Sequence, residues 1–164
     1  MIHYQYDDHV VPGVFILREN KQEQLYNRVF QAILDRLPAD SQGGPEHFSI
    51  DFELAPTNAF KAIFPNSTEA FSFFHFAQSL WRKLQADGHS AAYLDEANAD
   101  LRSHFHAIIS LCFVPPNDFP DALALLEQCV EDELDGVVHH LDRYYVNGRR
   151  RGRGRQSPRY RVEQ

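Results

Sequence analysis

The order of strand and helix patterns constrains the fold of this chain more than any other feature. In chain order the sequence predicts two strands, a helix, a strand, a helix, a strand and a helix, over residues 2–6, 10–17, 21–37, 47–51, 53–64, 70–74 and 75–87. Strands that alternate with helices in this way are typical of a sheet covered by helices. The first half of the chain is therefore predicted to be an α/β core.

Hydrophobic periodicity supports the first of these helices. Leu25, Val29, Ile33 and Leu37 recur every four residues, which puts them on one face of a helix. Asn20 precedes the pattern and is a residue type that caps helix N-termini. We therefore expect a capped helix with one buried face.

Beyond residue 87 the pattern is helical. Apolar residues recur at helical spacing over 96–113, 118–133 and 134–145, and Pro115-Pro116-Asn117 separates the first two of these helices. After Asn147-Gly148 the periodicity ends in an arginine-rich segment. These changes predict an α/β core, a helical segment and a flexible arginine-rich tail, over residues 1–87, 88–147 and 148–164.

Charge is distributed unevenly along the chain. Residues 1–147 carry nine basic and 22 acidic side chains, a net charge of −13. Residues 148–164 carry seven arginines and one glutamate, a net charge of +6. An acidic body with a basic tail indicates local contact with an anion, such as nucleic acid, rather than a uniformly basic binding surface.

Several absences indicate the compartment. No stretch approaches the roughly 18 uncharged apolar residues that a membrane-spanning helix needs, so no membrane partner is expected. Residues 1–5 lack the basic and then apolar pattern of a secretion signal. Cys112 and Cys129 are the only cysteines, too few for a disulfide framework, and they are predicted to be small core residues. We therefore expect a reducing interior, nucleus or cytoplasm.

Asp51 is the strongest single candidate for a functional residue. It is the last residue of a short predicted strand and directly precedes a helix, where open α/β sheets place their ligands. A carboxylate there could hold a hard divalent cation, which prefers oxygen ligands. Asp is also a good helix cap, so capping and metal binding both remain open on spacing alone. Glu53 lies in the first turn of the helix, where a negative charge is favoured for structural reasons.

Short segments around and after Asp51 occur in an order found in one known family. They are Ser49-Ile50-Asp51-Phe52-Glu53-Leu54-Ala55, Asn58-Ala59-Phe60, Phe64-Pro65-Asn66, Phe73-Phe74-His75-Phe76, Trp81-Arg82-Lys83-Leu84-Gln85, Phe113-Val114-Pro115-Pro116 and Tyr145-Val146-Asn147-Gly148. The opening Ile2-His3 strand and Val11-Pro12 fit the same order. Together these segments resemble the transposase domain of Mutator-like elements (MULE), and the resemblance spans essentially the whole chain.

This resemblance implies a ribonuclease H-like fold with an acidic triad of two Asp and one Glu. In that family the triad holds two divalent ions, usually Mg²⁺ with Mn²⁺ as the alternative, for DNA strand cleavage and transfer. Asp51 matches the second Asp, and the resemblance assigns it as a catalytic and metal-binding residue. The first Asp would lie on a strand before Met1, and the Glu beyond Gln164. We therefore expect an incomplete mixed sheet whose central first strand is missing, followed by an all-helical insertion segment.

The histidines are predicted to have structural roles. The family's Cys-x-x-His segment reads Ser72-Phe73-Phe74-His75 here, and a serine hydroxyl is a poor substitute for a metal-binding thiolate. His75 is therefore predicted to be packed or capping. His104 and His106 are two positions apart on a predicted helix and do not share a face, so a shared metal is not expected.

Basic side chains are the candidates for contact with DNA. Arg82 and Lys83 follow Trp81 on a predicted helix, where a solvated helix face is the alternative interpretation. Five arginines are concentrated in the tail, at Arg149, Arg150, Arg151, Arg153 and Arg155. Such a segment fits phosphate binding or a nuclear-import signal, and a plain disordered linker is the alternative.

The sequence thus favours a fragment of a MULE-type DNA transposase domain that is inactive by itself. Its expected partner is DNA at the ends of a transposable element, its expected location is the nucleus with the cytoplasm as fallback, and a homo-oligomer is compatible with it. The alternative is a non-catalytic remnant that binds nucleic acid or protein through its helical region and arginine tail. A third hypothesis is a small helical adaptor without transposase ancestry.

Overall fold

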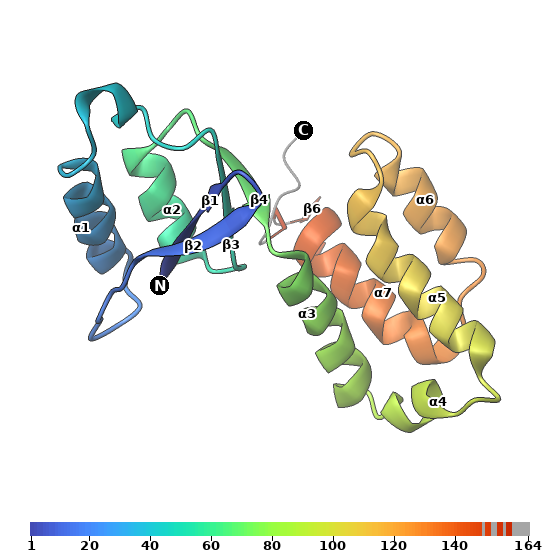
Figure 1. Ribbon diagram of the computed structural model, residues 1–164. Helices are drawn as coiled ribbons and strands as arrows, with labels where there is room; N and C mark the ends of the chain where they lie inside the picture. Colours follow the sequence, from blue (N-terminus) through green and yellow to red (C-terminus); the bar gives the residue numbers. More distant parts are fainter. Residues whose placement is uncertain (149, 152–153, 156, 159–164) are drawn as a thin grey trace. The chain divides into compact units, whose positions relative to one another are not determined.

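The structure, a computed structural model, describes residues 1–148, 150–151, 154–155 and 157–158. Contacts divide the chain into two compact units, Met1–Phe71 and Ser72–Gln164. Figure 1 labels the helices and strands of both units. Strands and helices around Asp51 make up the first unit, and the second unit is mainly helical.

The first unit opens with an antiparallel hairpin. β1 (Ile2–Tyr6) pairs with β2 (His9–Val14) through the two-residue turn Asp7-Asp8. The backbone φ of Asp7 is 49°, a left-handed conformation that short hairpin turns require and that Asp tolerates. Near the start of β1 the register shifts, and Gly13 is the extra residue on β2. A Cβ at Gly13 would lie 2.7 Å from Cδ1 of Tyr4, so glycine makes room for that ring.

Two helices supply the core of the first unit. α1 (Glu23–Leu34) packs against α2 (Leu54–Ile63). The ring of Phe30 meets the ring of Phe60 edge to face, with 5.1 Å between the centroids. The buried residues of this core are Phe30, Ala59 and Phe64. The single-turn helix η1 (Ala39–Ser41) lies in the loop after α1.

The predicted periodicity of the first helix is confirmed, but α1 is shorter at both ends than the predicted range of 21–37. Val29, Ile33 and Leu37 are partly buried against the core. Asn20 does not cap the helix, because its Oδ1 accepts a hydrogen bond from the backbone N–H of Gln22 at 3.0 Å and forms a turn ahead of it. The helix therefore begins at Glu23.

A parallel pair of strands carries the region around Asp51. β3 (His47–Ile50) pairs with β4 (Thr68–Phe71), and α2 connects them. The predicted strand over 70–74 is displaced, because Ser72 is the N-cap residue of the next helix and Phe73-Phe74 begin that helix. Aromatic residues favour strands, which explains the error. The strand therefore ends at Phe71.

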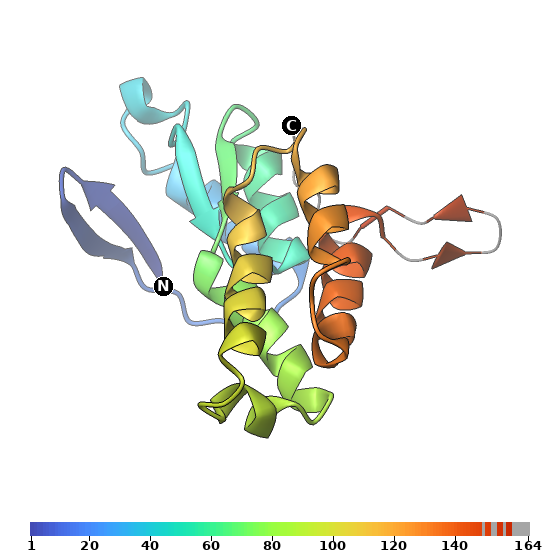
Figure 2. The same ribbon diagram turned by 90° about the vertical axis from the view of Figure 1, so that its right-hand side faces the viewer.

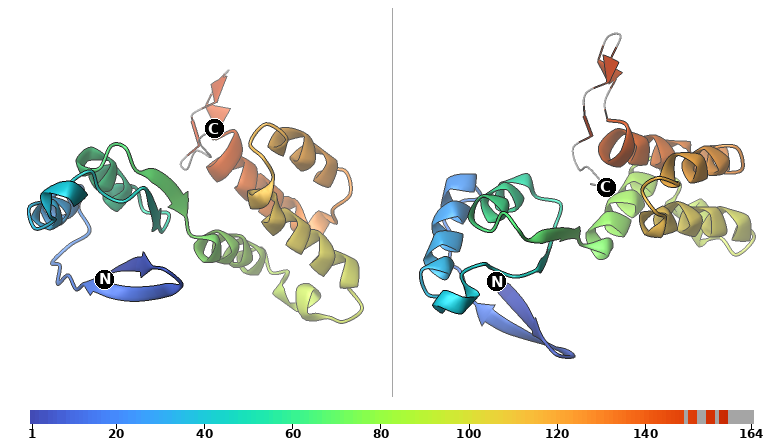
Figure 3. Two further views of the ribbon diagram at one scale, coloured as in Figure 1. Left: turned by 45° about the horizontal axis from the view of Figure 1, so that its top comes forward. Right: turned by 90° about the horizontal axis from the view of Figure 1, so that it is seen from above.

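The described strands form two-stranded sheets only. The pairs are β1–β2, β3–β4 and, in the second unit, β5–β6. Figures 2 and 3 show the β1–β2 hairpin set apart from the β3–β4 pair within the first unit. The α/β class is confirmed, whereas the described strands form separate pairs and do not confirm the predicted incomplete mixed sheet in detail.

The second unit is a helical bundle that ends in a short strand pair. In chain order its elements are α3 (Phe73–Ala86), α4 (Ser90–Leu94), α5 (Ala99–Ser110), η2 (Leu111–Phe113), α6 (Phe119–Leu126), η3 (Asp132–Leu134), α7 (Asp135–Leu141), the π-helical turn η4 (Asp142–Val146), β5 (Arg150–Arg151) and β6 (Gly154–Arg155). α3 packs against α5 and α7, and α5 packs against α6. The fully buried side chains between them are Leu80, Leu84, Ile108, Leu134, Val137 and Leu141.

Two expectations for the helical region were wrong in detail. The predicted helix over 118–133 ends at Leu126, and turns occupy the residues that follow before η3. Cys112 and Cys129 are exposed rather than buried. The sequence analysis placed both cysteines on the apolar faces of helices, but each lies just beyond the end of an α-helix. Cys112 is in η2, and Cys129 is in the turn after α6. None of the described helices has both the length and the apolar character to cross a bilayer.

Candidate functional site

Asp51 lies directly after β3, at the edge where two parallel strands end. Ile50 is the last residue of β3 and is in register with Phe71, the last residue of β4. The ring of Phe52 stacks on that of Phe71 at a centroid distance of 4.6 Å and covers this edge. The structure therefore puts Asp51 where the strand pattern predicted it, and the residue is exposed.

The helix that follows does not use Asp51 as its N-cap residue. α2 begins at Leu54, and Glu53 is the N-cap residue. The backbone carbonyl of Asp51 accepts a hydrogen bond from the N–H of Glu53 at 2.6 Å, which turns the chain from strand to helix. Of the two alternatives for Asp51, N-capping of α2 is therefore not observed.

Glu53 has a structural role at the start of α2. Lys21 Nζ lies 2.6 Å from Glu53 Oε1, and the two side chains are 64% and 40% exposed. A second link runs from Asn58 Nδ2 to Glu23 Oε2 at 3.0 Å. These contacts tie α2 to α1 and to the segment before it, and the Glu53 carboxylate is held by an ammonium group.

The donor set around Asp51 does not fit a two-ion centre. A pair of bridged divalent ions needs several carboxylates in one place. Among the described residues no group of three or more His, Cys, Asp or Glu side chains gathers closely enough to hold a metal ion. Glu53, the nearest carboxylate along the chain, is paired with Lys21. No reaction step can be assigned to the described residues through such ions.

The histidines make local contacts in the second unit. His75 Nδ1 lies 2.9 Å from Ser72 Oγ at the start of α3, so the Ser-x-x-His segment forms a hydrogen bond across one helical turn. His104 Nδ1 contacts Glu131 Oε2 at 2.9 Å, whereas His106 Nε2 contacts the hydroxyl of Tyr93 at 3.1 Å. His104 and His106 have different partners, as expected for residues that do not share a face.

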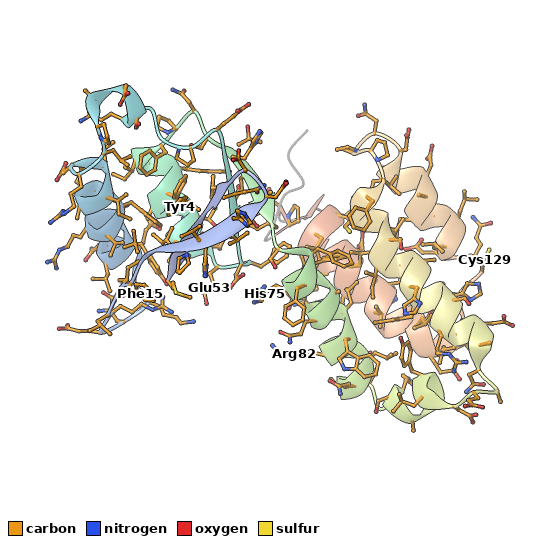
Figure 4. All side chains as sticks on the ribbon, viewed as in Figure 1. Tyr4, Phe15, Glu53, His75, Arg82 and Cys129 are labelled. Carbon is orange, nitrogen blue, oxygen red and sulfur yellow. The ribbon has the colours of Figure 1, made fainter. Side chains whose placement is uncertain are left out.

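Arg82 and Lys83 differ in their surroundings. Trp81 packs against Tyr93, with 4.9 Å between the ring centroids, so its ring is occupied within the bundle. Lys83 forms an ion pair with Asp87 one turn along α3. Arg82 is exposed on the side of α3 that faces away from the bundle (Figure 4). Arg82 is therefore the better placed of the two for contact with an anion.

Electrostatics disfavour the helical bundle as a general binding surface for nucleic acid. Residues 72–148 carry four basic and twelve acidic side chains, a net charge of −8. Positive charge is concentrated in the tail, where the backbone of Arg150–Arg151 pairs with Gly154–Arg155 in an antiparallel register. Arg149 and Arg153 lie outside the described residues. The short strand pair was not predicted from the sequence.

One polar cluster was missed by sequence reasoning. His140 Nε2 lies 3.1 Å from Ser79 Oγ, and the hydroxyl of Tyr145 donates to the same oxygen at 3.2 Å. Burial is the largest effect that lowers the pKa of His140, and the positive charges of Lys83 and Arg143 lower it further. The negative charge of Asp87 raises this pKa by a smaller amount. The cluster joins α3 to α7 and η4, and no short motif in the sequence indicates it.

Residues 1–79 match the family model of the MULE transposase domain. Residues 1–79 are part of a MULE transposase domain. This MULE region includes the hairpin, the Asp51 strand and the Ser72-x-x-His75 turn, whereas Arg82 and the arginine tail lie beyond it. Searches among curated proteins and among solved structures find no match to the chain. The match contradicts the hypothesis of a helical adaptor without transposase ancestry.

Proposed function

We propose that this chain is a fragment of a MULE-type DNA transposase whose family activity is metal-dependent strand cleavage and transfer. Asp51 is the retained metal-binding and catalytic acid of that domain. The observation that carries the proposal is the position of Asp51 immediately after β3, at the carboxyl end of the parallel β3–β4 pair and inside the matched region. Active-site ligands of open α/β sheets bind at such strand ends.

The strand arrangement supports an incomplete ribonuclease H-like sheet. In the complete fold a central first strand joins an antiparallel group to a parallel group. The first unit contains one antiparallel pair, β1–β2, and one parallel pair, β3–β4, with no strand between them among the described residues. Each buried backbone group left unpaired costs about 1–3 kcal/mol, so a supplied strand would stabilise the unit considerably.

The chain by itself is inactive on this proposal. Two-ion phosphoryl transfer requires ligands that hold both ions a few ångströms apart, on either side of the reacting phosphate. Asp51 supplies one carboxylate, and the remaining acids of the triad come from segments outside this chain. Mg²⁺ or Mn²⁺ is the cofactor of the complete domain, and element-end DNA in the nucleus is its substrate.

The second candidate is a non-catalytic remnant that binds nucleic acid or protein. The charge distribution favours the tail as its contact with nucleic acid, because the bundle is acidic and the tail carries the density of arginines. Its contact residues are Arg82, Arg149, Arg150, Arg151, Arg153 and Arg155, with Lys83 weakened by its pairing to Asp87. A binding role of this kind needs no divalent ion.

Calorimetric titration with Mn²⁺ tests the role of Asp51 in this chain. The proposal predicts weak binding that is lost in Asp51→Ala. Binding should be kept in the matched control Glu53→Ala, because the Glu53 carboxylate is engaged by Lys21. Equal binding by the wild type and Asp51→Ala would remove Asp51 from the metal site.

A further inference from the structure

We propose that β5 and β6 form a phosphate clamp, in which Arg150 and Arg155 together hold one backbone phosphate of DNA. The proposal rests on the second candidate function, the binding of nucleic acid through the arginine tail, and assigns a joint role to two of those arginines. It comes from the register of the strand pair and does not depend on Asp51.

The register puts two arginines directly opposite each other. Arg150 of β5 is in register with Arg155 of β6, and the other pair is Arg151 with Gly154. Two residues separate the strands in the sequence, so the residues next to that connection form a hydrogen-bonded pair. Arg150 and Arg155, one position further out, therefore form a non-hydrogen-bonded pair. The Cα atoms of such a pair are about 4.5 Å apart, and the two residues share one face of the strands.

This register is electrostatically unfavourable unless an anion is present. Like charges directly opposite each other destabilise a strand pair. Residues 143–162 contain no Asp or Glu, so no acid next to the pair along the chain neutralises it. An anion bound jointly by Arg150 and Arg155 would replace the repulsion by two attractive contacts. The register therefore points to an anionic ligand.

A phosphodiester group suits this pair better than the nearest acid of the chain. Asp142 is the last acid before β5, and its Oδ1 accepts a hydrogen bond from Asn147 Nδ2 at 2.5 Å. A backbone phosphate has two non-bridging oxygens that share one negative charge. Arginine binds such oxygens through charge-assisted hydrogen bonds, and two arginines can approach one phosphate from opposite strands.

The strand pair begins directly after a fixed point of the helical unit. Tyr145 is buried, and its ring meets the ring of Phe76 edge to face. The backbone carbonyl of Asp142 accepts hydrogen bonds from the N–H groups of Asn147 at 2.8 Å and Gly148 at 3.2 Å, which closes η4. Gly148 has a φ of 75°, a left-handed conformation that favours glycine, and β5 starts two residues later. The clamp is therefore tethered close to the end of η4.

The salt dependence of DNA binding tests whether one phosphate is shared. Each phosphate that the protein neutralises contributes about −0.9 to the slope of log affinity against log salt concentration. In fluorescence anisotropy with a labelled duplex, Arg150→Gln and Arg155→Gln should each weaken binding about tenfold with a nearly unchanged slope. The double variant should reduce the slope by about 0.9. The matched control Arg151→Gln, whose register partner is a glycine, should reduce the slope by about 0.9 by itself.

Amide hydrogen exchange separates strand pairing from DNA binding. In the wild type, DNA should slow exchange at the amides of Arg151 and Gly154, which hydrogen-bond the two strands together. Arg150→Glu puts opposite charges in register, so it should slow exchange at the same amides without DNA while it weakens DNA binding. Equally fast exchange in Arg150→Glu and the wild type without DNA would contradict the electrostatic basis of the clamp.

The choice of nucleic acid tests the partner. Phosphate contacts carry no sequence information, so the loss of affinity in Arg150→Gln should be the same for an element-end duplex and for an unrelated duplex of equal length. A loss confined to one of the two sequences would contradict a phosphate contact. A loss with single-stranded RNA but not with duplex DNA would make RNA the partner and overturn the proposal.

The remaining outcomes distinguish the clamp from the function on which it rests. A wild type that binds no duplex DNA would overturn both. A slope that falls by about 0.9 in each single variant and by about 1.8 in the double variant would overturn the clamp alone, because the arginines would then contact separate phosphates. Unchanged affinity in both single variants would also overturn the clamp and would indicate that the pair contacts carboxylates of this chain.

Discussion

Replacing Gly136 with alanine should destabilise the helical unit, although alanine is the better helix former. A Cβ at Gly136 would lie 2.0 Å from Oδ2 of Asp87 and 3.0 Å from its Cγ. The carboxylate would have to move away from its position beside Lys83, with which it forms an ion pair along α3. Glycine at this position is therefore explained by the close approach of α3 and α7.

The expected magnitude follows from two opposing effects. Overpacking of this kind costs about 1–3 kcal/mol, whereas replacing glycine within a helix gains about 0.5–1 kcal/mol. Gly136→Ala should therefore lower the free energy of unfolding by about 1 kcal/mol in the wild type. In an Asp87→Ala background the clash is absent, and the same substitution should raise the free energy of unfolding by about 0.5–1 kcal/mol.

Urea unfolding of the four proteins, followed by circular dichroism, measures this double-mutant cycle. The expected coupling between positions 87 and 136 is about 1–3 kcal/mol, the size of the steric effect. If Gly136→Ala has the same effect in both backgrounds, Asp87 does not pack against Gly136 and the reasoning is refuted.

Three further predictions concern the same unit. Burial and, to a smaller extent, the positive charge of Lys83 lower the pKa of His140. The stability contributed by neutral His140 should therefore be complete above about pH 6.5 and be lost as the pH falls towards the folded-state pKa. In urea unfolding, His140→Gln should reduce the dependence of the unfolding free energy on pH below about 6.5. Leu84→Ala removes a fully buried side chain and should cost about 2–5 kcal/mol, measured by urea unfolding. Arg82→Ala should weaken DNA binding and reduce its salt dependence more than Lys83→Ala does, because Lys83 is already paired; equal salt slopes in a fluorescence titration would contradict this.

Local patterns were sufficient to predict the elements of the first unit. The four-residue spacing of Leu25, Val29, Ile33 and Leu37 predicted a helix with one inward face, and Val29 and Ile33 of α1 do pack against the core. Asp51 at the end of β3 followed from a short strand pattern bounded by a helix. The pairing of strands was not predictable from local patterns. Whether the β1–β2 and β3–β4 pairs join into one sheet depends on a further strand that could lie between them.

The predicted ends of strands and helices were wrong where a residue's intrinsic preference differed from the element in which it lies. Phe73 and Phe74 favour a strand by residue type, yet they are the first two residues of α3, which follows Ser72. In the sequence, Cys129 continues the apolar face of the predicted helix. In the structure, α6 ends at Leu126, and Cys129 is exposed in the following turn. Periodicity alone does not mark where a helix stops.

Contacts between distant residues could not be read from the sequence. Glu53 and Lys21 are 32 positions apart, and their ion pair links the start of α2 to the segment before α1. Ser79 and His140 are 61 positions apart. The Tyr145-Val146-Asn147-Gly148 segment acquires a structural explanation, since Tyr145 is buried against Phe76 with 5.1 Å between the ring centroids. Its hydroxyl completes the contact to Ser79.

DNA cleavage by a longer protein tests the central claim most directly. The reading frame of this chain, extended at both ends with its flanking sequence, should cleave element-end DNA when Mg²⁺ or Mn²⁺ is added. Asp51→Asn should abolish cleavage while leaving the fold intact, whereas Glu53→Gln should retain it. Cleavage by Asp51→Asn at the wild-type rate would contradict the account.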